Sequence, residues 1–133
     1  MGYQRAVNSA RYLEYVREKG VGTFSLHQLQ MEGVLSVFRR IIEERNAPAI
    51  FWGFDVDGVR AADAPGVSAP SPLGLSAEEF CGLAGLAGAT HQTRVIEFTE
   101  VNPALDRDHQ TARLVAFAIH QFLLEEDNSD FGF

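Results

Sequence analysis

The sequence predicts an α/β fold of the three-layer α-β-α type, in which helices cover the faces of a mainly parallel sheet. Helical and strand-like patterns alternate along the chain, as they do in parallel sheets joined by helical crossovers. The run 49–53 is short, aromatic and almost free of polar groups, which is typical of a strand buried on both faces. A length of 133 residues with 46% apolar and 22% charged residues suits one globular domain.

The first half of the chain shows two helical and two strand-like patterns, each with an identifiable boundary. Asn8 is a possible N-cap for the first helix, and Gly20 stops it. Pro48 breaks the second helix before the apolar strand begins. The expected elements are a helix over 8–19, a strand over 21–26, a helix over 31–45 and a strand that ends at Asp55.

The second half begins with a Pro- and Gly-rich loop over 58–75, long enough to favour a functional role. Ser76 and Glu79 have the spacing of a capping box and predict a helix start. The elements expected next are a helix from Ser76 to about Ala87, a strand over 94–98 and a helix over 110–124. We take residues 1–126 as one domain and 127–133 as an acidic tail.

Composition excludes several classes of function. The net charge of −7 and the single lysine argue against a nucleic-acid partner. No stretch approaches the length of a membrane-spanning helix, and no signal-peptide core opens the chain. The one cysteine, Cys81, fits a small buried hydrophobe in a helix and a cytoplasmic location.

A pair of carboxylates, Asp55 and Asp57, follows the apolar strand. Because side chains alternate along a strand, we expect the two to project to the same side. Ligands of open α/β sheets gather beyond the carboxyl ends of the strands. Neighbouring carboxylates raise each other's pKa unless a cation lies between them, and a hard divalent metal is the usual cation. The pair therefore predicts half of a metal site.

Two other interpretations of the pair remain open at this point. The acids can simply cap the next loop or helix. The run from Phe54 to Val59 also resembles the first motif of haloacid-dehalogenase-type phosphatases, in which the first aspartate is the nucleophile. However, no lysine follows Asp57, and Arg60 stands where that family usually has Thr or Leu.

Three ordered blocks together resemble the ureohydrolase family, which contains arginases, agmatinases and formimidoylglutamases. The first is Asp55-Val56-Asp57-Gly58 followed by Pro-Gly-rich turns, Gly74-Leu75-Ser76 and a Glu-bearing helix. The second block is Ile96-Glu97-Phe98-Thr99-Glu100-Val101-Asn102-Pro103-Ala104-Leu105-Asp106, and the third is Thr111-Ala112-Arg113-Leu114. The similarity runs over nearly the whole chain and implies an arginase-like fold.

Within that family, the chain most resembles formimidoylglutamases. Arginases and agmatinases usually place Asp-Pro soon after the carboxylate pair, whereas this chain has Arg60 and the segment 61–65 there. A positive charge suits N-formimidoyl-L-glutamate, which carries two carboxylates, better than it suits arginine or agmatine. Arg60 is therefore a candidate substrate-binding residue, and a structural ion pair with Asp63 is the equal alternative.

The resemblance implies a binuclear manganese site. Asp55 matches the carboxylate that bridges two Mn²⁺ ions, and Asp57 matches a ligand of one of them. The metals make hydroxide available for attack on the amidine carbon, which releases glutamate and formamide. Glu100 matches the glutamate that faces the cationic amidinium group, and a strand-end acid that accepts hydrogen bonds from amides is its alternative.

The family's other metal ligands, a His and an Asp-Ala-His-x-Asp motif, do not occur in the sequence. The four histidines are scattered and are expected to have no metal role: His27, His91, His109 and His120. We therefore expect the C-terminal portion of an amidinohydrolase, inactive alone, with an open sheet edge that favours a homo-oligomer or a complementing N-terminal half. A non-catalytic fragment or assembly domain is the alternative.

Overall fold

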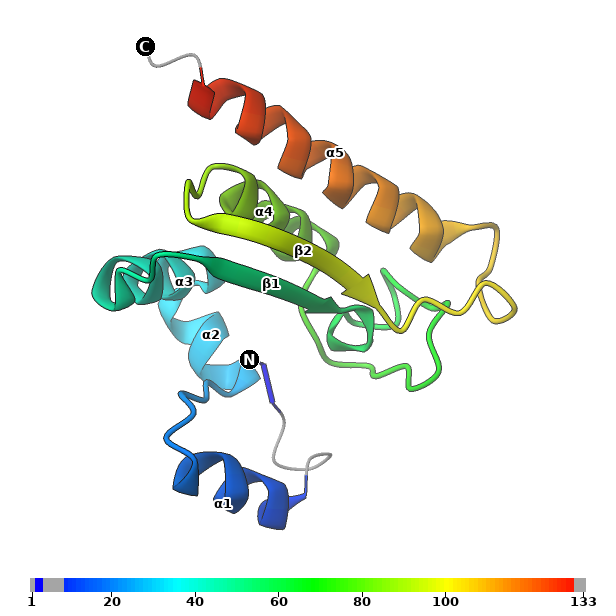
Figure 1. Ribbon diagram of the computed structural model, residues 1–133. Coiled ribbons are helices and arrows are strands. Elements are labelled where there is room, and N and C mark those ends of the chain that lie inside the picture. Colours follow the sequence, from blue (N-terminus) through cyan, green and yellow to red (C-terminus); the bar gives the residue numbers. More distant parts are fainter. Residues whose placement is uncertain (1, 4–8, 131–133) are drawn as a thin grey trace.

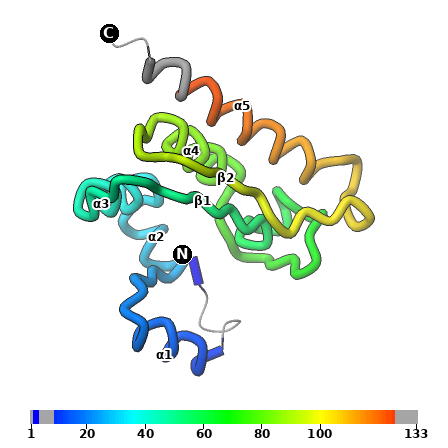
Figure 2. Tube along the Cα trace, viewed as in Figure 1, coloured from blue at the N-terminus to red at the C-terminus, as the bar shows by residue number. Residues whose placement is uncertain are grey.

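The computed structural model describes residues 2–3 and 9–130, which form a short parallel sheet with helices against one face (Figure 1). The elements in chain order are α1 (Ala10–Glu18), α2 (Leu26–Glu32), α3 (Val34–Arg45), β1 (Ile50–Asp55), the 3-10 turn η1 (Val56–Gly58), α4 (Ala77–Gly88), β2 (Thr93–Thr99) and α5 (Gln110–Asp130). Figure 2 traces the chain from α1, at the bottom of the view, to α5, which lies beside α4 at the top. No helix in the described ranges is long and apolar enough to cross a membrane.

The sheet consists of β1 and β2, which run parallel and are joined by a crossover through α4. The paired residues include Phe51 with Val95, Gly53 with Glu97 and Asp55 with Thr99. Because the strands are parallel and in register, both carboxyl ends reach the same edge of the sheet. The α/β fold class with a parallel sheet is confirmed.

One face of the sheet carries an aromatic core. The Trp52 ring stacks on Phe38 of α3, with ring centroids 5.9 Å apart. Phe54 packs on Phe80 of α4 at 5.4 Å and on Phe98 of β2 at 5.1 Å. Helices α3 and α4 therefore cover the same face, and these rings form part of the apolar core.

The opposite face of the sheet is exposed in the part of the chain that the structure describes. Phe51 of β1 is 59% exposed, and its partner Val95 on β2 is 50% exposed. Two adjacent large apolar residues on a sheet face are typical of a surface that another element covers. Of the three layers expected for an α-β-α fold, the described residues therefore supply two: the sheet and one layer of helices.

The predicted strand over 21–26 is wrong. The residue Ser25 caps α2 instead: its side chain accepts the Gln28 N–H, and the Gln28 side chain accepts the Ser25 N–H. This capping box starts a helix where the Val and Phe content of the run had indicated a strand. The only bridge in this run joins Ser25 to Tyr3 among the described residues.

The other helices agree with their predictions except at the ends. The predicted helix over 31–45 is two helices, because Gly33, with φ of 83°, separates α2 from α3. The helix α1 stops before Gly20 as predicted, while its predicted cap Asn8 lies outside the described residues.

The last helix, α5, continues past Leu124 to Asp130, since no Gly or Pro interrupts that stretch. The start of the predicted acidic tail 127–133 is thus helical, and residues 131–133 lie outside the described part.

Candidate metal and substrate site

The carboxylate pair lies at the end of β1. The strand stops at Asp55, and the chain turns immediately into η1, so Asp57 lies in a 3-10 turn rather than on the strand. The Asp55 Oδ1 atom accepts a hydrogen bond from the Asp57 backbone N–H at 3.0 Å. The expected strand alternation therefore does not extend to Asp57, and a local cap brings the two residues together instead.

Asp57 is surrounded by other acids and by one amide donor. Its Oδ1 atom accepts the Ala69 N–H at 3.4 Å. Partial burial raises the pKa of the Asp57 carboxyl; the Ala69 N–H opposes that rise, while the charges of Asp55 and Glu100 add to it. Three carboxylates thus interact at the carboxyl ends of two adjacent strands, which is where a cation would relieve their repulsion.

Glu100 follows β2 directly and has an unusual backbone. Its φ is 67°, in the left-handed region that a side chain with a Cβ rarely adopts. The Glu100 Oε2 atom accepts a hydrogen bond from the Ser68 hydroxyl at 3.3 Å. This contact links β2 to the loop after β1, and the Glu100 side chain itself remains exposed.

The loop 59–76 is folded back on η1. The Arg60 N–H donates to the Leu75 carbonyl at 3.0 Å, and the Leu75 N–H donates to the Gly58 carbonyl at 2.9 Å. A Cβ at Gly74 would lie 2.6 Å from the Arg60 nitrogen and 2.6 Å from the Gly58 oxygen. The backbone can approach this closely only with glycine at position 74. These backbone contacts therefore restrain the loop beside the carboxylates, and the loop forms one wall of the site.

Arg60 forms the ion pair that was the alternative to a substrate contact. Its Nε donates to Asp63 Oδ2 at 2.7 Å, and the same oxygen accepts the Ala77 N–H at the start of α4. Burial alone would raise the pKa of Asp63, but the hydrogen bonds from Arg60 and Ala77 lower it below its ordinary value. The Arg60 side chain is still 47% exposed, so its guanidinium can meet a ligand as well.

The donor set fits a hard divalent cation in type but not in number. Asp55 and Asp57 offer carboxylate oxygens, which such ions prefer. Within the described ranges, no group of three or more His, Cys, Asp and Glu side chains is placed to hold a metal ion.

The structure adds residues that sequence reasoning had not singled out. Ser68 and Ala69 hold Glu100 and Asp57 from the loop. Ser68 could have been identified from the sequence, because it carries a hydroxyl group in the Pro- and Gly-rich loop that follows the two aspartates. Nothing in the local sequence identifies Ala69, because it acts through its backbone.

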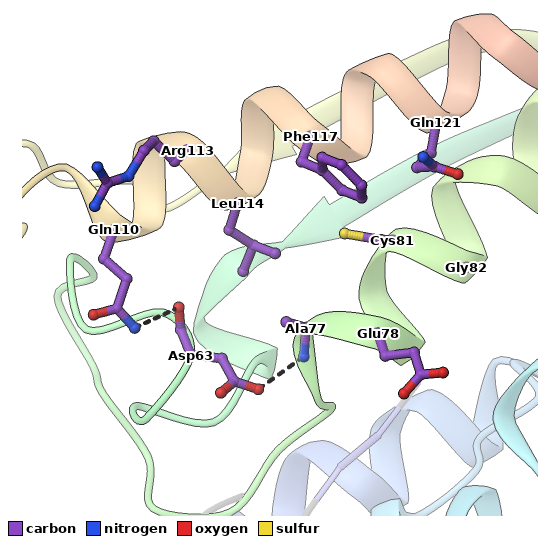
Figure 3. A pocket seen from close by; sticks show the side chains of 10 residues that line it. All are labelled: Asp63, Ala77, Glu78, Cys81, Gly82, Gln110, Arg113, Leu114, Phe117 and Gln121. Carbon is purple, nitrogen blue, oxygen red and sulfur yellow. Dashed lines mark hydrogen bonds between the residues drawn. The ribbon is translucent and has the colours of Figure 1, made fainter.

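A separate groove lies between the start of α4 and α5 (Figure 3). Cys81 and Phe117 line it, and Arg113 lies at its rim. Partial burial raises the pKa of the Cys81 thiol, as expected for a cysteine that packs as an apolar residue in a helix. The groove is lined by none of Asp55, Asp57 and Glu100, so it is separate from their site.

Known proteins match this chain over nearly its whole length. A family model described as the Arginase family matches residues 1–125. The formimidoylglutamase of Staphylococcus aureus (strain MRSA252) is 29% identical over 126 residues, which cover 92% of this chain and 40% of that protein. Trypanosoma cruzi formiminoglutamase with Mn²⁺ is 26% identical, with a TM-score of 0.89. The match covers 94% of this chain and 41% of the T. cruzi chain. An arginase from Bacillus subtilis is 25% identical, with a TM-score of 0.80. The match covers 86% of this chain and 40% of the arginase chain. The chain thus spans about 40% of the length of its curated relatives.

Proposed function

The chain belongs to the arginase family, and from this premise we propose that it contributes to a manganese-dependent amidinohydrolase. The proposed reaction converts N-formimidoyl-L-glutamate and water to L-glutamate and formamide. The observation that carries the proposal is the meeting of Asp55, Asp57 and Glu100 where β1 and β2 end. Similarity to formimidoylglutamases supports the choice of substrate.

Each carboxylate has a proposed role that follows from its position. Asp55 and Asp57 would hold the ions: burial raises the pKa of Asp57, the charges of Asp55 and Glu100 raise it further, and a cation would offset that repulsion. Manganese, when bound, supplies the Lewis acidity that makes water a nucleophile near neutral pH. Glu100 is exposed beyond the pair and would orient the cationic amidine by charge and hydrogen bonding.

Arg60 has a proposed role in recognising the substrate. The bond to Asp63 uses its Nε, and about half of the side chain remains accessible. A guanidinium held in this way is oriented in advance for a substrate carboxylate. N-formimidoyl-L-glutamate has two carboxylates, whereas arginine has one and agmatine has none. The positive charge of Arg60 therefore favours the dicarboxylate substrate.

The remaining metal ligands would have to come from outside these 133 residues. Two octahedral ions need about ten ligand positions even when two ligands bridge them, and two aspartates supply four oxygens. The exposed face of β1 and β2 is where such a segment would pack. The source is a complementing N-terminal half, as part of a longer protein or as a partner.

Metal content and turnover test the proposal. Mn²⁺ is measured by elemental analysis after gel filtration, for the chain alone and for the chain co-expressed with the N-terminal part of the S. aureus relative. We expect little metal and no turnover from the chain alone, and stoichiometric Mn²⁺ with formamide release from the complex. Asp57→Asn should abolish both in the complex, while Glu44→Gln, which removes an exposed charge on α3, should change neither.

A non-catalytic assembly domain is the second candidate. It is favoured by the missing third ligand among the described residues and by the exposed apolar pair on the sheet. A complex that forms with the N-terminal part but takes up no Mn²⁺ would favour this candidate and contradict the enzyme. The phosphatase alternative has lost its basis, because the family match covers the whole motif region.

A further inference from the structure

The first turn of α5 is bonded to the loop that follows the carboxylate pair. The Gln110 side-chain amide donates to the carbonyls of Ala62 at 2.8 Å and Asp63 at 3.2 Å, the second of which is drawn in Figure 3. The next residue, Thr111, accepts the Gly66 N–H on its hydroxyl oxygen at 2.7 Å. Two successive residues of α5 thus hold this loop.

Asp106 completes the contact between α5 and Gly66. Its carboxylate accepts the backbone N–H groups of Thr111 at 2.9 Å and Ala112 at 3.0 Å, and it also accepts the Thr111 hydroxyl. Burial alone would raise the pKa of Asp106, but these donors lower it. We call Gly66, Asp106 and Thr111 the Gly66 clamp.

The Gly66 clamp has little freedom to move. Thr111 is fully buried, and its hydroxyl both accepts from Gly66 and donates to Asp106. A Cβ added at Gly66 would lie 2.5 Å from the Cβ of Asp106. The buried Gly66 N–H donates to the Thr111 hydroxyl, and losing that acceptor would leave a buried donor unsatisfied.

The clamp is connected to Glu100 through the backbone. The Gly66 carbonyl accepts the Asn102 N–H at 2.8 Å, two residues after Glu100. Glu100 has the left-handed φ of 67°, a conformation that persists only where the surroundings enforce it. The bond to Asn102 is one of the restraints on that segment.

The clamp is also connected to the carboxylates through the next residues of the loop. Ser68 donates to the Glu100 carboxylate at 3.3 Å, and the Ala69 N–H donates to the Asp57 carboxylate at 3.4 Å. Both donors lie within three residues of Gly66. Displacing Gly66 therefore moves the donors that hold both carboxylates.

We propose that Asp106 and Thr111 are positioning residues, which hold Gly66 and thereby set Glu100 and Asp57 relative to each other. The importance of this geometry for catalysis rests on the proposed function. The clamp itself does not touch the carboxylate pair, so its effect passes through the loop and the Asn102 contact.

The test compares Thr111→Val with Thr90→Val by amide hydrogen exchange of the whole chain. Both variants replace a buried hydroxyl with a methyl group, and the Thr90 hydroxyl donates to the Leu86 carbonyl near the end of α4, away from Gly66. After correction for global stability, we expect exchange at Gly66 and Asn102 to be about tenfold faster in Thr111→Val alone. Thr111→Ser, which keeps the hydroxyl, should restore slow exchange.

A second measurement reports on the site. Mn²⁺ in large excess, enough to populate a weak site, should broaden the amide signals of Asp57, Ser68 and Glu100 together in the ¹⁵N-labelled parent. In Thr111→Val, broadening at Ser68 and Glu100 should fall relative to Asp57, and it should return in Thr111→Ser. A purely structural role would lower stability without changing this ratio. Should Thr111→Val not fold, Asp106→Asn serves as the variant, with a change in the same direction.

The outcomes separate this inference from the proposed function. Equal exchange and equal broadening ratios in the Thr111 and Thr90 variants would overturn the positioning role, whether or not the parent binds Mn²⁺. If Mn²⁺ broadens no amide of the parent, the metal site proposed for these residues fails in the isolated chain. Selective loss of protection at Gly66 and Asn102 would then still support the clamp.

Discussion

Replacing Gly74 with alanine should destabilise the loop 59–76, because the added methyl group would collide with the backbone of residues 58–60. The new Cβ would lie 2.6–2.7 Å from three backbone atoms of residues 58–60, none of which can rotate away. Overpacking of this kind costs about 1–3 kcal/mol, and each of the two displaced loop hydrogen bonds about 1 kcal/mol. The reduced freedom of the unfolded chain offsets about 0.4–1 kcal/mol, which leaves a net loss of about 2–5 kcal/mol.

Two matched substitutions serve as controls for Gly74→Ala. A Cβ at Gly58 meets nothing within 4 Å, so Gly58→Ala should be neutral or slightly stabilising in the same turn. Gly85 lies inside α4, where a Cβ meets only the Glu125 side chain at 3.5 Å, so Gly85→Ala should stabilise by about 0.5–1 kcal/mol. Free energies of unfolding come from urea titrations followed by far-UV circular dichroism. A Gly74→Ala value within about 0.5 kcal/mol of Gly58→Ala would refute the steric reasoning.

Three further predictions concern the core, the acids and the exposed face. Thr93→Val should lower the free energy of unfolding by about 1–3 kcal/mol in urea titrations, because the Trp52 indole N–H loses its acceptor. Asp63 and Asp106 have lowered pKa values when folded, so each stabilises the fold above its unfolded pKa, and that contribution is lost as pH falls through the folded pKa. Thermal unfolding between roughly pH 5 and pH 3 should therefore show a smaller loss of stability in Asp63→Asn and Asp106→Asn than in the parent; equal slopes would contradict the assignment. Phe51→Ser should reduce self-association in sedimentation velocity while changing stability by less than about 1 kcal/mol, and unchanged association would show that the exposed face is not responsible.

The parts of the fold that local chemistry specifies could be predicted from the sequence. The apolar run before Asp55 and the capping box at Ser76 and Glu79 define their elements through nearest neighbours alone. The run 21–26 could not be resolved in this way, because its strand-forming residues competed with a second capping box at Ser25. Only Ser25 found a bridging partner in the described part of the chain, so the helix start prevailed.

For the candidate site, the sequence could predict where the two aspartates lie in the fold better than how their side chains are arranged. The carboxyl end of a buried strand indicates where ligands gather, and Asp55 lies there. The position of Asp57 depends on a 3-10 turn, which the alternation of a strand cannot foresee. The approach of Glu100 depends on the parallel register of β1 and β2, and its contact with Ser68 depends on a long-range fold of the loop. Such contacts arise from tertiary structure and have no local sequence pattern.

The chain contains a single tryptophan, and that residue lies at the centre of the strand pair. Trp52 stacks on Phe38 from the first half of the chain, and its indole nitrogen donates to Thr93 on the neighbouring strand. Its intrinsic fluorescence therefore reports the packing of β1 on α3 and the docking of β2 beside β1. Stopped-flow emission can thus time the formation of the sheet without any introduced label, separately from the helices that circular dichroism detects.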